Sequence, residues 1–180
     1  MKRTICLIAV LLLISITAAA GWNDMPEHLY TKITLRDWQG TPEVLVTIAD
    51  WSLPFLEALL DDSDLEDIRV VFDMTELVCT NKWSADSRIL YIGIVPFRGK
   101  EGDAYFWPTS IVFTQDHYAW EVDYDDCMIG FSDNFSGRVY GLLDGFICLP
   151  AKLDWNREFT IWYDDTKTTF GPLLKDSSSR

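Results

Sequence analysis

The sequence predicts a mainly β protein, a single antiparallel β-sandwich with one short helix. Short apolar runs rich in β-branched and aromatic residues recur along the chain, separated by Gly, Pro, Asn and Asp. Within the run Tyr118–Tyr124, apolar and polar side chains alternate with a period of two residues, as in a half-buried strand. About eight strands of this kind are typical of a β-sandwich, and a closed β-barrel is the alternative.

The first two strands are predicted to form a hairpin. Apolar residues alternate with polar ones around Ile33 and again from Val44 to Ile48. Between the two runs, Gln39-Gly40-Thr41-Pro42 has the composition of a turn.

The segment Ser52–Leu60 is the one segment with a clear helical pattern. Ser52 suits a helix N-cap, and Pro54 is tolerated in the first turn. Leu56 and Leu60 lie on one helical face, which is wide enough to need burial. We expect a helix of about two to three turns that covers one end of a sheet.

Further strands are predicted in the middle of the chain. The run Ile89–Val95 is nearly all apolar, so we expect it to be central in its sheet, and Pro96 ends it. The other β-prone runs are Val70–Phe72, Leu77–Cys79, Ala104–Trp107 and Ile111–Phe113.

The stretch from Gly137 to Tyr163 predicts the closing strands. Two apolar runs, Val139–Leu143 and Phe146–Leu149, are separated by a predicted bend or bulge at Gly145. A polar turn follows, and the period of two returns from Phe159 to Tyr163. The core is expected to include Ile92, Phe113, Trp120, Val122, Phe146, Phe159 and Ile161.

The order Gly-Phe-Ile-Cys-Leu-Pro at 145–150, a polar turn and Phe-Thr-Ile-Trp-Tyr at 159–163 also carries a family resemblance. It resembles the C-terminal half of immunoglobulin-like domains in secreted bacterial and archaeal proteins of unknown function. The resemblance covers Ile89–Tyr163. It implies an immunoglobulin-like sandwich and export, and it brings no catalytic residue.

Residues 1–20 have the layout of a secretory signal peptide. A short basic start precedes an apolar run, and three alanines at its end suit cleavage before Gly21. An uncleaved membrane anchor is the alternative, although the run is short for a span of about 20 residues. The sequence therefore predicts a secreted or cell-envelope protein, with one domain at 21–175 and a disordered tail at 176–180.

The chain is strongly acidic. Its formal net charge is −13, and losing Lys2 and Arg3 with the leader would take it to −15. Such a charge repels nucleic acid and anionic membranes, and it favours cations and basic partners.

Three cysteines, Cys79, Cys127 and Cys148, follow the leader. Export permits a disulfide, three different single bridges are possible, and an odd number leaves at least one thiol free or paired with another molecule. The alternative is that all three are buried as small hydrophobic residues. Asn134 lies in an N-glycosylation acceptor pattern.

Tryptophans supply the candidate binding residues. The chain has 8 Trp, and exposed aromatic rings can stack on sugars or anchor a partner. Trp38, Trp83 and Trp155 lie in predicted turns, and Trp162 lies on the face opposite Phe159 and Ile161. We therefore name Trp83, Trp155 and Trp162 as the candidate binding residues, with core packing as the alternative role for each.

Acidic residues around the run Tyr118–Tyr124 supply a candidate metal site. Asp123 and Asp125 follow one face of the predicted strand, Asp126 comes next, and Asp116 precedes the strand. Carboxylate oxygens in an exported protein suit Ca²⁺, which takes six to eight of them. A solvated acidic face without an ion is the alternative, and no other cofactor is expected.

The sequence contains no nucleophile elbow, zinc helix, phosphate loop or dinucleotide-binding glycine motif. We therefore expect a non-enzymatic protein that binds or assembles with an extracellular or cell-envelope component, either a protein or a glycan. A secreted hydrolase that uses a pair of acidic residues is the alternative.

Overall fold

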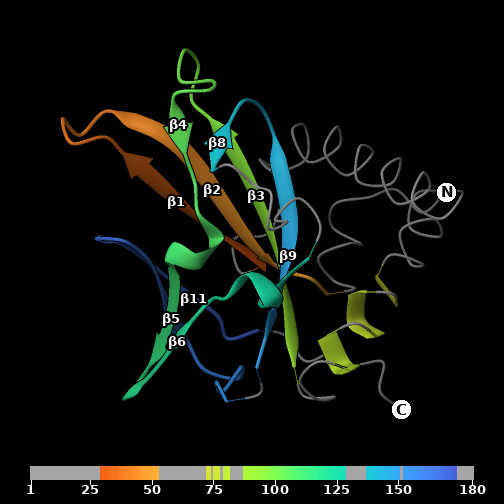
Figure 1. The fold of residues 1–180 in the computed structure, drawn as a ribbon. Coiled ribbons are helices and arrows are strands. Elements are labelled where there is room, and N and C mark those ends of the chain that lie inside the picture. The colour runs from red at the N-terminus through yellow and green to blue at the C-terminus, as the bar shows by residue number, and fades with distance from the viewer. Residues whose placement is uncertain are drawn as a thin grey trace, which may run out of the picture.

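The computed structural model describes residues 29–52, 72–73, 75–77, 79–81, 87–128, 137–150 and 152–173, which form a mainly β fold of antiparallel strands (Figure 1). The larger sheet has the order β1-β2-β3-β9-β7, with strands Tyr30–Arg36, Pro42–Asp50, Arg88–Pro96, Leu143–Leu149 and Cys127–Met128. The second sheet has the order β11-β10-β5-β6, with strands Thr166–Phe170, Phe159–Tyr163, Ile111–Gln115 and Tyr118–Glu121. A two-stranded ribbon pairs β4, Ala104–Tyr105, with β8, Arg138–Val139, and the 3-10 helices are η2, Pro108–Ser110, and η3, Tyr124–Asp126.

In the described residues both larger sheets keep two edge strands, so they form no closed barrel. Several predictions fall outside the described residues: the leader at 1–20, the helix residues 53–60, Trp83, Asn134 and the tail at 176–180.

The predicted N-terminal hairpin is confirmed by β1 and β2. The two strands pair in antiparallel register, with Ile33 opposite Val46. The turn between them is closed by Asp37, whose side-chain oxygen accepts hydrogen bonds from the backbone N–H of Gln39 at 2.9 Å and Thr41 at 2.8 Å. Gly40 has a φ of 82°, a left-handed conformation that glycine adopts without steric cost.

The strand β3 is central and buried on both faces, as its apolar sequence predicts. It lies between β2 and β9 in the larger sheet. Leu90 and Ile92 point into the core that the two sheets share, whereas Tyr91 points to the opposite face. The larger sheet therefore needs cover on both sides.

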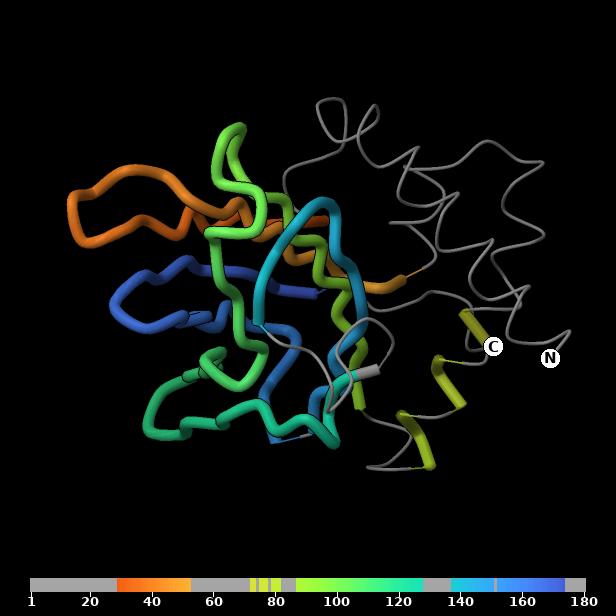
Figure 2. The backbone as a smooth tube through the Cα atoms, turned by 45° about the horizontal axis from the view of Figure 1, so that its top comes forward, coloured from red at the N-terminus to blue at the C-terminus, as the bar shows by residue number. Residues whose placement is uncertain are grey.

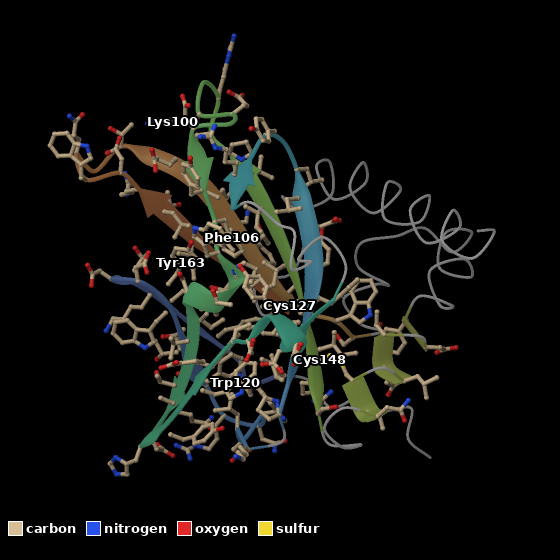
Figure 3. All side chains as sticks on the ribbon, viewed as in Figure 1. Lys100, Phe106, Trp120, Cys127, Cys148 and Tyr163 are labelled. Atoms are coloured by element: carbon tan, nitrogen blue, oxygen red, sulfur yellow. A yellow bond between two sulfur atoms is a disulfide. The ribbon has the colours of Figure 1, made fainter. Side chains whose placement is uncertain are left out.

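The shared core contains residues from both sheets and from the ribbon. The larger sheet contributes Ile48, Ile92, Ile94 and Ile147, and the second sheet contributes Ile111, Phe113, Phe159 and Ile161. The ribbon contributes Ala104 and Val139, and Phe106 follows directly after β4. Phe106 and Tyr163 stack with ring centroids 5.2 Å apart, in the interior in front of the larger sheet (Figure 3). Six of the seven residues expected in the core are buried; Trp120 is half-buried, because β6 is an edge strand.

The opposite face of the larger sheet is covered by helical residues at 72–73, 75–77 and 79–81. The strands predicted at Val70–Phe72 and Leu77–Cys79 are therefore wrong where the structure describes them. The buried positions are Phe72, Thr75 and Cys79, spaced by three and four residues, whereas 73, 76 and 77 are exposed. This helical spacing of buried residues prevails over the local β propensity of the segment.

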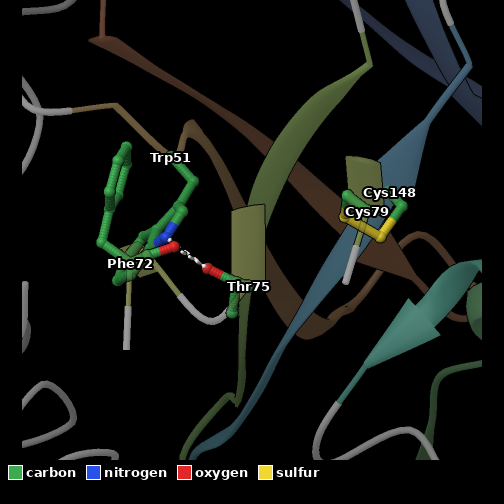
Figure 4. The surroundings of a disulfide bond; sticks show 5 residues. All are labelled: Trp51, Phe72, Thr75, Cys79 and Cys148. Carbon is green, nitrogen blue, oxygen red and sulfur yellow. Dashed lines mark hydrogen bonds between the residues drawn. A yellow bond between two sulfur atoms is a disulfide. The ribbon is translucent and has the colours of Figure 1, made fainter. Parts of the chain in front are cut away.

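A disulfide joins Cys79 of these helical residues to Cys148 of β9 (Figure 4). Beside it, Trp51 packs edge-on against Phe146 at 4.6 Å, and its indole N–H donates to Thr75 Oγ1 at 3.1 Å. The sequence left three pairings open; the structure selects Cys79 with Cys148, and the Cys127 thiol lies outside this bridge, 3.4 Å from the Asp123 carbonyl oxygen.

The predicted bend at Gly145 is also wrong. The strand β9 runs through Gly145 in unbroken register, with Gly145 opposite Ile92 of β3. The interruption lies earlier, at residues 140–142, where the chain leaves the short strand β8 and enters β9. Because β8 pairs with β4 rather than with the larger sheet, the apolar run Val139–Leu143 belongs to two different strand pairs.

Candidate functional site

Of the tryptophans predicted to bind a partner, the structure describes Trp155 and Trp162. Trp155 is only 8% exposed and packs edge-on against Phe159 at 5.6 Å, so the prediction that it forms a surface ring is wrong. The chain turns back over it, and the backbone N–H of Leu173 donates to the Trp155 carbonyl at 2.8 Å. Trp155 therefore contributes to the core rather than to a binding surface.

Trp162 lies on the outward face of β10, where it is half-buried. Its indole N–H donates to Thr114 Oγ1 at 2.9 Å, and the Lys167 ammonium lies 4.9 Å from the centre of its ring. Both neighbours come from strands that flank β10, so Trp162 is held within its own sheet.

The four candidate calcium ligands are not brought together. Asp116 precedes β6 and pairs with Arg157, whereas Asp123 follows the same strand at its far end. Asp123 and Asp126 cap η3 reciprocally, and the Asp123 backbone N–H donates to Asp126 Oδ2 at 3.0 Å. Asp126 is buried and Asp125 is exposed. Because β6 ends at Glu121, the acidic residues after it do not continue one strand face.

Among the described residues, no three His, Cys, Asp or Glu side chains lie close enough together to hold a metal ion. The carboxylates of the predicted calcium site instead form local structural contacts, an ion pair at Asp116 and a helix cap at Asp123 and Asp126.

The ion pair at Asp116 gives a testable pH dependence. Arg157 holds Asp116 with two bonds of 2.9 and 3.0 Å, and it lowers the pKa of that carboxyl. Since the pKa is lower in the folded state, the contribution of the pair is present above the ordinary pKa of Asp and is lost as the pH falls through the lowered value. In an NMR titration, we expect Asp116 to lose its charge below the ordinary range, and Arg157→Gln to return it there. The same titration midpoint in both proteins would contradict this assignment.

Exposed large hydrophobic side chains gather at one end of the molecule, which we call the loop end. It consists of the β1–β2 turn at 37–41, the β3–β4 loop at 97–103 and the β8–β9 connection at 140–142, all drawn in the upper part of Figure 1. In Figure 2 the β1–β2 turn protrudes at the left and the β3–β4 loop at the top. Among the described residues, most exposed large hydrophobic side chains lie in these loops or beside them: Trp38, Val95, Phe97, Tyr105, Tyr140 and Leu142. Trp107 lies beyond the other end of β4, at the start of η2, and Leu77 lies among the helical residues.

Four exposed side chains share the outer face of the β4–β8 ribbon, which runs from the loop end to η2. Tyr105 and Trp107 alternate with the buried Phe106, and Arg138 and Tyr140 alternate with the buried Val139. Tyr105 pairs directly with Arg138 across the ribbon, and the guanidinium carbon lies 5.5 Å from the centre of the Tyr105 ring. We call Tyr105, Trp107, Arg138 and Tyr140 the ribbon platform.

Two glycines let the outer rings of the ribbon platform lie against the backbone. A Cβ atom on Gly137 would lie 2.4 Å from the Trp107 ring, and one on Gly102 would lie 2.8 Å from the Tyr140 ring. Both glycines also have positive φ, 78° and 79°. Each ring therefore lies close to glycine backbone on one side, which limits its freedom to move.

A hydrogen bond to the second sheet holds the backbone of the ribbon platform in place. The Trp107 N–H donates to the Tyr163 hydroxyl at 2.8 Å, and burial of that phenol raises its pKa. The Tyr140 phenol, and then that of Tyr105, raise the pKa of the Arg138 guanidinium. Among the described residues Arg138 forms no ion pair, so it is a cation held by aromatic side chains.

The β1–β2 turn carries the most exposed of these rings. Trp38 is 91% exposed, although its turn is closed by Asp37 and tied to the β3–β4 loop. Lys100 of that loop lies 3.4 Å from Asp37 and 3.3 Å from Glu43, and it is labelled at the top of Figure 3. Backbone N–H donors, chiefly that of Thr41, lower the pKa of Asp37. The turn is therefore fixed while its ring is presented to solvent.

The sequence prediction missed the ribbon platform because it selected two tryptophans in turns and one on a strand face, and because it did not include the pairing of β4 with β8. A usable signal was present in the two short patterns Tyr105-Phe106-Trp107 and Arg138-Val139-Tyr140, in which one apolar residue separates two large side chains.

Comparisons with protein-family models, curated protein sequences and solved structures found no match. Among the described residues, the helices are too short or too polar to cross a bilayer.

Proposed function

We propose that this chain is an exported, immunoglobulin-like β-sandwich protein that binds or assembles with an extracellular or cell-envelope component through its ribbon platform. Two antiparallel sheets that share one core support the sandwich assignment. The observation that carries the binding function is the row of exposed rings fixed against Gly102 and Gly137.

We infer a binding role because exposing large aromatic side chains to water costs free energy, and a bound partner would remove that cost. Tyr105 is 45% exposed and Tyr140 is 67% exposed, in a fold that buries other aromatic side chains completely. Rigid Tyr and Trp side chains lose little conformational entropy on binding, and Tyr, Trp and Arg dominate the energetics of many interfaces. These features favour a binding protein over the hydrolase alternative, which needs carboxylates as its reacting groups.

The test is co-sedimentation with an envelope preparation of the source cell, using the chain produced with its own leader. We expect the parent protein to pellet with the envelope, and Tyr105→Ala and Tyr140→Ala each to weaken binding about tenfold. Leu77→Ala is the matched control. Leu77 is 61% exposed, but it lies away from the ribbon platform, among the helical residues that cover the opposite face of the larger sheet. Ring variants that pellet as well as the parent would refute the proposed site.

A further inference from the structure

We propose that the ligand of the ribbon platform is a neutral polysaccharide, an inference that rests on the proposed function and names its ligand class. Four properties of the ribbon platform support this choice: the shape of the ring row, the donors beside it, the charge around it and its exposed area.

The rings form a row along the ribbon. Trp107 lies over Gly137, Tyr105 pairs with Arg138, and Tyr140 lies over Gly102. At about 3.4 Å per residue, these positions span roughly 14 Å of strand, which suits a short oligosaccharide segment better than a single sugar. Each outer ring lies close to glycine backbone on one side, and a sugar presents a C–H face that can stack on an exposed aromatic ring.

Polar groups lie beside the rings, as a sugar requires. Arg138 carries up to five N–H donors in a planar group, and the two phenols of the platform both donate and accept. Because Arg138 forms no ion pair among the described residues, its donors are not committed to a carboxylate. The platform can therefore bind hydroxyl groups around a stacked ring.

The charge around the platform favours a neutral ligand. In and beside the loop end, five acidic side chains face four basic ones: Asp37, Glu43, Glu101, Asp103 and Asp144 against Arg36, Arg98, Lys100 and Arg138. Lys100 already pairs with Asp37 and Glu43. The whole chain carries −13, so it repels a polyanion. An uncharged polymer does not meet this repulsion, and its hydroxyl groups can accept hydrogen bonds from Arg138 without an ion pair.

The exposed area argues against a large protein partner at the platform alone. Tyr105, Trp107 and Tyr140 are 45%, 37% and 67% exposed, so with about 150–250 Å² per aromatic side chain they offer roughly 300 Å². A stable protein interface buries about 800 Å² on each partner. A polysaccharide needs only the ring row and its neighbouring donors.

The experiment is native affinity electrophoresis of the full chain in gels that contain one soluble polysaccharide each. The neutral arms are a β-glucan, a xylan and a mannan, and the charged arms are a polyuronate and a sulfated polymer. We expect retardation by at least one neutral polymer and by neither charged polymer. Tyr105→Ala and Tyr140→Ala should each weaken that retardation about five- to tenfold.

A glycine pair gives a second, sharper control. Gly99 and Gly102 lie in the same loop with φ of 82° and 79°, so Ala at either position has a similar backbone cost. A Cβ at Gly99 meets nothing within 4 Å, whereas one at Gly102 meets the Tyr140 ring. Gly102→Ala should therefore weaken retardation, and Gly99→Ala should leave it at the parental value. Melting temperatures of all variants show whether each one is folded.

Two results would overturn the inference. The first is retardation by no neutral polymer, and the second is retardation by the charged polymers alone. If envelope binding persists in either case and still depends on Tyr105 and Tyr140, the proposed function stands with a different ligand. If Tyr105→Ala and Tyr140→Ala both bind the envelope as well as the parent protein does, the proposed function fails as well.

Discussion

Replacing Cys79 and Cys148 together by Ala is expected to lower the free energy of unfolding by about 4 kcal/mol, because the bridge closes a segment with a sequence separation of 69. In the chain-entropy account, the bridge restricts the unfolded state more than the folded one. It also ties helical residues to β9, over Trp51, Tyr91 and Phe146. Urea unfolding of the oxidised chain and of the double variant measures the difference.

The matched control is Cys127→Ala, since Cys127 is a half-buried cysteine on β7 that lies outside the Cys79–Cys148 bridge. It should cost much less than the double variant. A double variant as stable as the parent would mean that the bridge contributes nothing to stability, and the attachment of the helical residues would then need another cause.

The second large effect is expected at Phe106. Phe106→Ala should lower the free energy of unfolding by about 3–5 kcal/mol, because Phe106 has 0% exposure and stacks on Tyr163 inside the shared core. The neighbouring Tyr105→Ala removes a ring of similar size from the outer face, where no cavity forms. It should cost about 1 kcal/mol or less.

This pair separates stability from binding. Phe106→Ala should reduce the melting temperature strongly, whereas Tyr105→Ala should reduce binding with little change in melting. Equal losses of stability in the two variants would show that the inner and outer faces of β4 are assigned incorrectly.

Much of the β structure could be predicted because its signals are local. The β1–β2 hairpin, the central strand β3 and the alternation in β10 each depend on neighbouring residues with a period of two or on a continuous apolar run. The strand β11 was not predicted, because Thr166–Phe170 carries polar Thr and Lys and has one buried side chain, Phe170.

The helical residues around Phe72 were read as strands because Val70-Val71-Phe72 is rich in β-branched residues. Their helical conformation accompanies contacts with residues far away in the chain, such as Trp51 on Phe72 and Cys148 on Cys79. Local propensity does not contain that information.

The candidate site was harder to predict than the fold. The ribbon platform exists only because Ala104 and Tyr105 pair with Val139 and Arg138, and this pairing joins distant parts of the chain. Conversely, Trp155 lies in a polar turn yet points inward against Phe159. Residue type and turn chemistry therefore identified the aromatic character of the surface but not the residues that form it.

The two glycines beneath the outer rings have a consequence for how this sequence can change over evolutionary time. Because a Cβ at Gly137 would occupy the space of the Trp107 ring, and one at Gly102 that of Tyr140, each glycine and its ring should be gained and lost together. Descendants that abandon the large residue at position 140 are released from the steric need for Gly at 102, although the positive φ still favours it. Gly40 and Gly99, which have the same backbone need and no ring above them, should drift independently of any aromatic position.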